Sequence, residues 1–151
     1  MILRKEKILV IEDFASVRSI LCDILSKKGY QVLEAPDGTV ALDMLKKEQV
    51  DLVISDYNMP RTDGMGLLMQ IRKDEIMNKL PVIFVTSEQD TEKRKAAQRA
   101  GLTDWISKPY KYFRLMNSVE SALSRKWLNA SAAAANQWGE VGSERIDKRG
   151  T

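Results

Sequence analysis

The side chains best suited to chemistry in this 151-residue chain each follow a short apolar run. Glu12 and Asp13 follow the first run, Asp56 follows a later one, and Thr86 and Lys108 come after the last two. In a parallel sheet the carboxyl ends of all strands lie along one edge, so side chains distant in sequence converge there. We therefore expect these five residues to lie close together.

Carboxylates that are brought together repel one another and raise each other's pKa values unless a positive charge intervenes. A site made of oxygen ligands suits a hard divalent cation such as Mg²⁺. Lys108 adds a point charge for a phosphate oxygen, and Thr86 adds a hydroxyl group. Taken singly, each residue is more simply a solvated acid, a turn residue or a helix cap. Together they predict a phosphoryl-transfer site with Asp56 as the nucleophile.

Apolar runs alternate with helical patterns five times along the chain. This alternation predicts a parallel sheet that is covered by helices on both faces. The expected fold is α/β: a flavodoxin-like, doubly wound (βα)5 arrangement with five parallel strands in the order 2-1-3-4-5. Asp37 is expected to cap the second helix, and the second strand is expected to lie near an edge. The expected strands are 7–11, 31–34, 52–55, 81–85 and 105–107.

Helical periodicity also predicts which residues face the core. The first helix, which ends at Gly29, and the last helix, which begins near Tyr112, each carry an inner apolar stripe. The helix at 91–100 is poor in large apolar residues, so we expect it to be weakly held and free to shift. Tyr57 is expected to be a surface side chain without a role. The expected stripes are Val17, Ile20, Leu21, Ile24 and Leu25 in the first helix, and Phe113, Met116, Val119 and Leu123 in the last.

Composition excludes several classes of function. The net charge is +3 and the basic residues are scattered, so nothing predicts binding to nucleic acid. No signal peptide and no membrane-spanning run is visible, and the single Cys22 fits a reducing compartment, so a cytoplasmic protein without membrane contact is expected. The chain has no histidine. A histidine base, metal ligand or phosphohistidine within this chain is thus excluded.

Four segments of the sequence occur together in a known family. They are residues 8–13, residues 56–60 with Asp63-Gly64, residues 85–88 and Lys108-Pro109. With these segments, residues 5–125 resemble the receiver domain of two-component response regulators, and among them the single-domain chemotaxis regulators. The resemblance implies a phosphoprotein that acts in a two-component phosphorelay.

The resemblance also implies roles for the residues at the strand ends. Asp56 would accept a phosphoryl group from a sensor histidine kinase or a phosphotransfer protein. Mg²⁺ would be held by Asp13, Asp56 and the backbone carbonyl of Asn58, with Glu12 acting through a water molecule. Lys108 would bind the acyl phosphate. Glu12 stands where the family more often has aspartate.

A second set of residues would turn the modification into a signal. The resemblance implies that Thr86 closes onto the phosphoryl group and that the aromatic switch residue, Trp105, follows it inward. Asn58 and Glu88 would tune the lifetime of the acyl phosphate. Because the chain has no histidine, the donor must be another protein.

The downstream target is expected to bind the face formed by the 91–100 helix, the strand at Trp105 and the last helix. This face is charged and chiefly basic, although a plainly solvated helix face is an equal alternative. Its charged residues are Glu92, Lys93, Arg94, Lys95 and Arg99.

Two other functions remain open. A phosphoaspartate phosphatase also uses a nucleophilic aspartate at a strand end, but it carries a second aspartate two residues on. Asn58 occupies that position here and cannot transfer a proton, so we expect a switch and not an enzyme that turns over many substrates. The chain could also be the receiver module of a longer regulator whose output domain is missing.

The receiver pattern ends near residue 126. Residues 1–126 are expected to form the receiver domain, and residues 127–151 a helical extension or a disordered tail. If the last helix continued through the alanines at 132–135, Trp127 and Trp138 would fall on nearly the same face.

Overall fold

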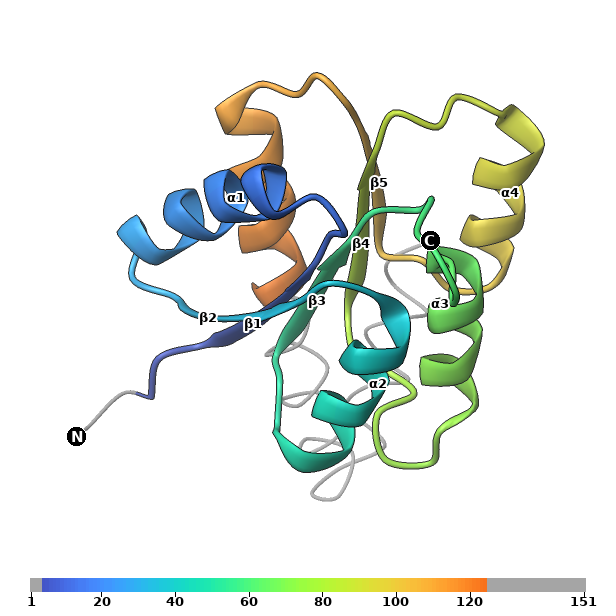
Figure 1. Cartoon of the computed structure of the whole chain (residues 1–151), viewed down its shortest axis with the longest axis horizontal. Coiled ribbons are helices and arrows are strands. Elements are labelled where there is room, and N and C mark those ends of the chain that lie inside the picture. The colour runs from blue at the N-terminus through green and yellow to red at the C-terminus, as the bar shows by residue number, and fades with distance from the viewer. Residues whose placement is uncertain (1–3, 125–151) are drawn as a thin grey trace, which may run out of the picture.

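A computed structural model describes residues 4–124 of the chain. Within them, five parallel strands form a sheet in the order β2-β1-β3-β4-β5, which confirms the predicted flavodoxin-like fold (Figure 1). The strands are β1 (Lys7–Ile11), β2 (Gln31–Ala35), β3 (Leu52–Ser55), β4 (Val82–Thr86) and β5 (Asp104–Ser107).

Helices join successive strands and cover both faces of the sheet (Figure 1). One face is covered by α1 and by the last helix, which spans residues 112–124 of the described chain. The other face is covered by α2, α3 and α4. The bounds are α1 (Ala15–Lys27), α2 (Gly38–Lys47), α3 (Gly64–Lys73) and α4 (Thr91–Arg99).

The central strands are buried on both sides because each face of the sheet has its own apolar core. In β1, Ile8 and Val10 pack toward α1 and the last helix, whereas Leu9 and Ile11 pack toward the opposite helices. A strand buried in this way is apolar at nearly every position, which explains the continuous apolar runs. β2 has two exposed, two partly buried and one buried residue and lies at the edge, as predicted.

The structure confirms Asp37 as the cap of α2, and α3 and α4 begin in the same way. Side-chain oxygens of Asp37, Asp63 and Asp90 accept hydrogen bonds from backbone N–H groups in the first turns of α2, α3 and α4. Gly29 and Gly101, which follow α1 and α4, have φ angles of 97° and 99°. Glycine adopts this left-handed conformation without steric cost, so both helices can turn sharply into the next strand.

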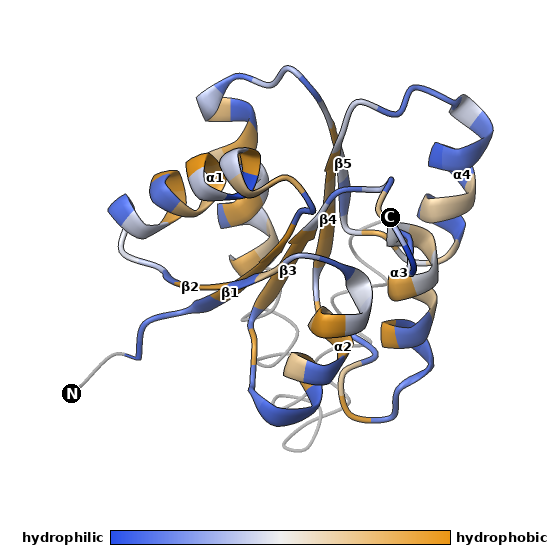
Figure 2. Ribbon diagram, in the orientation of Figure 1, coloured by the Kyte–Doolittle hydropathy of each residue, from blue (hydrophilic) through white to orange (hydrophobic). Residues whose placement is uncertain are grey.

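Three of the predicted inward-facing residues are exposed, and Val17 in α1 is the least exposed of them at 37%. Ile20 in α1 is 62% exposed and Phe113 in the last helix is 75% exposed. The residues of α1 that are buried against the sheet are Leu21, Cys22 and Leu25, so the buried stripe is narrower than the apolar pattern. Phe113 lies in the first turn of the last helix, which begins near the top of the molecule in Figure 2.

Helix α4 is held by few apolar contacts, as its composition predicts. Among its residues Ala97 is the one that is fully buried. Figure 2 colours most of the α4 ribbon as hydrophilic. Its position therefore depends on polar contacts at its ends more than the positions of α1 and α3 do.

A polar cluster ties the last helix to the start of β5. Arg114 donates two hydrogen bonds to Asp104, at 2.8 and 3.0 Å, and the Ser118 hydroxyl donates a third at 2.6 Å. Burial works to raise the pKa of the Asp104 carboxyl. The hydrogen bonds from Arg114, Ser118 and the Trp105 N–H outweigh burial and hold this pKa below its ordinary value of 3.8.

Asp104→Asn is expected to lower the free energy of unfolding by about 1–2 kcal/mol at pH 7, because charge-assisted hydrogen bonds are lost at a partly exposed site. Since the folded-state pKa is depressed, this stabilisation is complete above the unfolded pKa and is lost as the pH falls through the folded one. In urea unfolding, the difference in free energy of unfolding between Asp104→Asn and wild type should therefore be smaller at pH 3 than at pH 7.

The matched control is Asp23→Asn, because Asp23 pairs with Lys27 at 3.0 Å on the exposed surface of α1. It should leave the unfolding free energy within about 0.5 kcal/mol of wild type. An Asp104→Asn penalty that did not shrink in acid would contradict the assignment of this stabilisation to the ionised carboxylate.

Within residues 4–124, no helix combines the length and the apolar character that a membrane crossing requires. The predicted boundary after residue 126 lies outside the described residues. So does the tail at 127–151 with Trp127 and Trp138, and these remain predictions.

Candidate functional site

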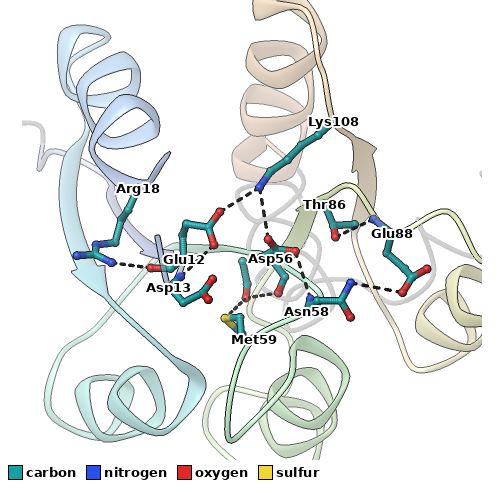
Figure 3. Close-up of polar contacts among 10 residues, drawn as sticks. Glu12, Asp13, Arg18, Asp56, Asn58, Met59, Thr86, Glu88 and Lys108 are labelled. Carbon is teal, nitrogen blue, oxygen red and sulfur yellow. Dashed lines mark hydrogen bonds and ion pairs between the residues drawn. The ribbon is translucent and has the colours of Figure 1, made fainter. Parts of the chain in front are cut away.

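The predicted site residues meet at the carboxyl edge of the sheet (Figure 3). The register aligns the strand ends, because Ile11 of β1 pairs with Ser55 of β3, and Thr86 of β4 pairs with Ser107 of β5. The residues that follow these ends are Glu12, Asp13, Asp56 and Lys108. The structure therefore brings together, at one edge, the residues that the sequence predicts to converge.

Lys108 lies between two of the carboxylates. Its Nζ is 3.0 Å from Glu12 Oε1 and 3.4 Å from Asp56 Oδ2. Burial works to lower the pKa of the Lys108 ammonium, but its contacts with Glu12 and Asp56 outweigh burial and raise it. The lysine is therefore a fixed positive charge directly beside the predicted nucleophile.

Glu12 is almost fully buried, with 4% of its surface exposed. Its Oε2 accepts the N–H of Asp13 at 2.9 Å, and Arg18 donates to its backbone carbonyl at 2.6 Å. Burial raises the pKa of the Glu12 carboxyl, and the neighbouring Asp13 and Asp56 add to the rise, although Lys108 opposes it. Negative charge is thus crowded here and is only partly balanced by Lys108.

Asp56 is held by the loop that leaves β3. Its N–H donates to the Ile11 carbonyl at 3.1 Å, and its Oδ1 accepts the N–H of Asn58 at 3.2 Å. The loop then packs tightly on the start of α3, because a Cβ added at Gly64 would lie 2.7 Å from the Asp56 carbonyl oxygen. Only glycine fits there without moving the backbone, which explains the Asp63-Gly64 pair after the nucleophile.

The donor types fit the predicted Mg²⁺, since Asp13, Asp56 and the Asn58 carbonyl all offer oxygen. The crowding of Asp13 and Asp56 around Glu12, which raises its pKa, is also what a cation would relieve. Within residues 4–124, however, no group of three or more acidic, cysteine or histidine side chains is gathered closely enough to hold a metal ion. The cation between Glu12 and Asp56 is the Lys108 ammonium, and the metal site stays a prediction.

Thr86, the last residue of β4, and Glu88, in the loop that follows it, lie on the other side of Asp56 from Glu12 (Figure 3). Thr86 is fully buried, and its hydroxyl oxygen accepts the N–H of Glu88 at 3.2 Å. The Glu88 carboxylate accepts hydrogen bonds from Lys93 at 2.9 Å and from the Asn58 side chain at 3.4 Å. These contacts, with Lys93 foremost, lower the pKa of Glu88 to about 2. Lys93 was not singled out by the sequence for this contact.

The prediction that Tyr57 is a surface side chain is wrong. Tyr57 is 8% exposed, and its ring centroid lies 5.6 Å from that of Phe84 and 5.4 Å from that of Trp105. Trp105 is itself buried at 3% exposure. The physical reason lies in α4, whose small apolar surface leaves space over β4 and β5 that aromatic rings fill. The lack of large apolar residues in α4 was the feature of the sequence that could have indicated the burial of Tyr57.

Comparison with known proteins places this site in context. The family model described as "Response regulator receiver domain" matches residues 8–120. The chemotaxis protein CheY-3 of Vibrio cholerae is 39% identical over 120 residues, which cover 79% of this chain and 92% of that protein. The probable transcriptional regulator ycf27 of Porphyridium aerugineum is 40% identical over 123 residues, which cover 82% of this chain but 50% of that protein.

Solved structures agree with the fold. A response regulator receiver domain protein from Clostridium thermocellum matches with a TM-score of 0.76 and 30% identity, over 82% of this chain and 98% of that one. The chemotaxis protein CheY4 of Vibrio cholerae matches with a TM-score of 0.74 and 30% identity, over 80% of this chain and its own full length.

Proposed function

The chain belongs to the response regulator receiver domain family, and from this premise we propose that it is a phosphorylation switch whose acceptor is Asp56. Receiver domains interact with histidine kinases and with downstream targets. We propose that this one takes its phosphoryl group from a sensor histidine kinase or a phosphotransfer protein in the cytoplasm. Its similarity to the chemotaxis proteins CheY-3 and CheY4 of Vibrio cholerae supports a role in chemotaxis.

One observation carries this proposal. Lys108 Nζ lies 3.4 Å from Asp56 Oδ2, and the same ammonium is held by Glu12 at 3.0 Å. A carboxylate that keeps 14% of its side-chain surface exposed is thus reachable by a donor and already faces a cation. This pairing is what a transient phosphoryl group requires, because its added negative charge needs a fixed partner.

The proposed reaction is a direct transfer. An Asp56 carboxylate oxygen attacks phosphorus, the bond to the donor's histidine nitrogen breaks, and that nitrogen keeps the electron pair. Lys108 balances the negative charge on the phosphoryl oxygens, and the Thr86 hydroxyl can donate to one of them. Asp13, Asp56 and the Asn58 carbonyl would hold Mg²⁺, with Glu12 acting through water. When bound, the ion would neutralise part of the charge that develops during transfer.

Phosphorylation would change the shape of the face formed by α4, β5 and the last helix. Thr86 lies at the end of β4 and would be drawn toward the phosphoryl group. Trp105 on β5 pairs with Phe84, two residues before Thr86, and packs against the Phe84 ring. Because α4 has a single fully buried residue, a small movement of Thr86 can shift this helix. We propose that a downstream protein binds this face differently after phosphorylation.

The direct test uses the full-length chain with acetyl phosphate and Mg²⁺. Intact-mass measurement should show the gain of one phosphoryl group per chain, and hydroxylamine should remove it, since hydroxylamine cleaves acyl phosphates. Chelation of the metal should suppress the gain. No mass gain, or a gain that resists hydroxylamine, would contradict an aspartyl phosphate.

Two alternatives are separable by experiment. A phosphatase of the phosphoaspartate class would turn over a generic ester such as p-nitrophenyl phosphate many times, whereas a switch should release at most about one equivalent per chain. The ycf27 relatives, twice the length of their match here, favour the second alternative, a receiver module of a longer regulator. The length of the gene product in its source cell decides that question.

A further inference from the structure

A connected set of polar contacts spans the gap between the phosphoacceptor loop and α4. Lys93, in the first turn of α4, donates to Glu88 Oε1 at 2.9 Å, and the Asn58 side chain donates to the same oxygen at 3.4 Å. We call Asn58, Glu88 and Lys93 the α4 bridge. Figure 3 shows two of its members, Asn58 and Glu88, side by side next to Asp56.

Glu88 is fixed within this bridge from several directions. Its other oxygen, Oε2, accepts the N–H groups of Gln89 at 3.1 Å and Asp90 at 3.2 Å. Its own N–H donates to the Thr86 hydroxyl. The carboxylate therefore has little freedom, and its Oε1 is the atom through which Lys93 acts on Asn58.

Asn58 connects the bridge to the acceptor itself. Its backbone N–H donates to Asp56 Oδ1 at 3.2 Å, while its side chain reaches Glu88. The path from Lys93 to Asp56 thus consists of three consecutive hydrogen bonds. A change at Lys93 can reach the acceptor without any movement of the sheet.

Lys93 is also placed to anchor α4. Its Nζ lies 5.8 Å from the centre of the Tyr57 ring, which packs against Phe84 and Trp105. Since α4 has a single fully buried residue, Ala97, these polar and cation–π contacts form a substantial part of its attachment. The same side chain therefore holds both the helix and the Glu88 carboxylate.

We propose that Lys93 is a positioning residue that keeps Glu88 and Asn58 closed across one side of Asp56 and so lengthens the lifetime of the phosphoryl group. This inference rests on the proposed function. Hydrolysis needs a water oxygen to attack phosphorus while the bond to the Asp56 oxygen breaks; the carboxylate keeps the electron pair, phosphate leaves, and the proton goes to bulk water. A bridge held shut by Lys93 restricts the approach of that water.

The test follows the loss of the phosphoryl group from full-length chain after acetyl phosphate is removed. Lys93→Gln should hydrolyse about two- to fivefold faster than wild type, the range expected from losing one partly exposed ion pair. Lys93→Arg should restore the wild-type rate, because the guanidinium can still donate to Glu88. The control is Lys95→Gln, which removes the neighbouring charge that faces Glu92 at 3.9 Å and should change nothing.

A double substitution separates this role from a general one. If Lys93 acts through Glu88, then Lys93→Gln should add nothing further in a Glu88→Gln background. Additive effects, an unchanged rate in Lys93→Gln, or equal acceleration by Lys95→Gln would each overturn the inference while leaving phosphorylation of Asp56 in place. A wild-type chain that acquires no phosphoryl group would overturn both proposals.

Discussion

Asp56→Asn is expected to abolish phosphorylation of the chain by acetyl phosphate or by a kinase. The amide has the size of the carboxylate but lacks a nucleophilic oxygen anion, so no acyl phosphate can form. Lys108 would keep its contact with Glu12 at 3.0 Å, and the fold should persist. Intact-mass measurement, with the unfolding midpoint recorded in parallel, would separate loss of the acceptor from loss of structure.

The matched control for this substitution is Asp43→Asn. Asp43 lies on the exposed surface of α2, where it pairs with Lys47 at 3.4 Å, and it should be labelled like wild type. Labelling that survives in folded Asp56→Asn protein would place the phosphoryl group elsewhere and would refute the assignment. Loss of labelling in Asp43→Asn would show that the assay responds to charge in general.

The strands were predictable because each central one is buried on both faces. A residue such as Val10 or Ile54 must be apolar whichever way it points, so the runs are continuous and short. Their carboxyl ends then fix the site, since parallel strands share an edge. The positions of Glu12, Asp56 and Lys108 follow from that rule alone.

The contacts within the site were less predictable than its members. The sequence predicted Mg²⁺ among the carboxylates and Lys108 beside a phosphate oxygen, whereas the structure shows Lys108 bonded to Glu12 as well as to Asp56. Charge alone does not tell which carboxylate a lysine contacts. The α4 bridge was unpredictable for the same reason, because Lys93 and Glu88 are five residues apart on either side of a helix start, a spacing without a helical rule.

Helical periodicity did not correctly predict the burial of every residue in the helices. A pattern at helical spacing says which residues share a face, but it does not say how far the underlying sheet extends. Ile20 is exposed although its neighbour Leu21 is buried, and Phe113 is exposed although Met116 in the same helix is buried. Tyr57 was wrongly predicted to be exposed. It is buried because α4 has too few large apolar side chains to fill the space beside the sheet.

The ring of Phe84 packs against the loop that follows Asp56. Phe84→Ala is expected to be the most damaging substitution for stability. Phe84 is fully buried, with its ring centroid 5.6 Å from that of Tyr57 and 5.9 Å from that of Trp105. Truncating a buried phenylalanine costs about 3–5 kcal/mol, because apolar contact is lost and a cavity remains. Urea unfolding measures this directly.

Phe113→Ala provides a control of the same residue type. Phe113 is 75% exposed, and its truncation should change the unfolding free energy by less than about 0.5 kcal/mol. The ring of Phe84 also packs against Gly64, at the start of α3, so the cavity would open directly under the Asp56 loop. Phosphorylation of the remaining folded Phe84→Ala protein should therefore slow as well, whereas Phe113→Ala should be labelled normally. Equal penalties for the two substitutions would contradict the burial pattern on which the site's support depends.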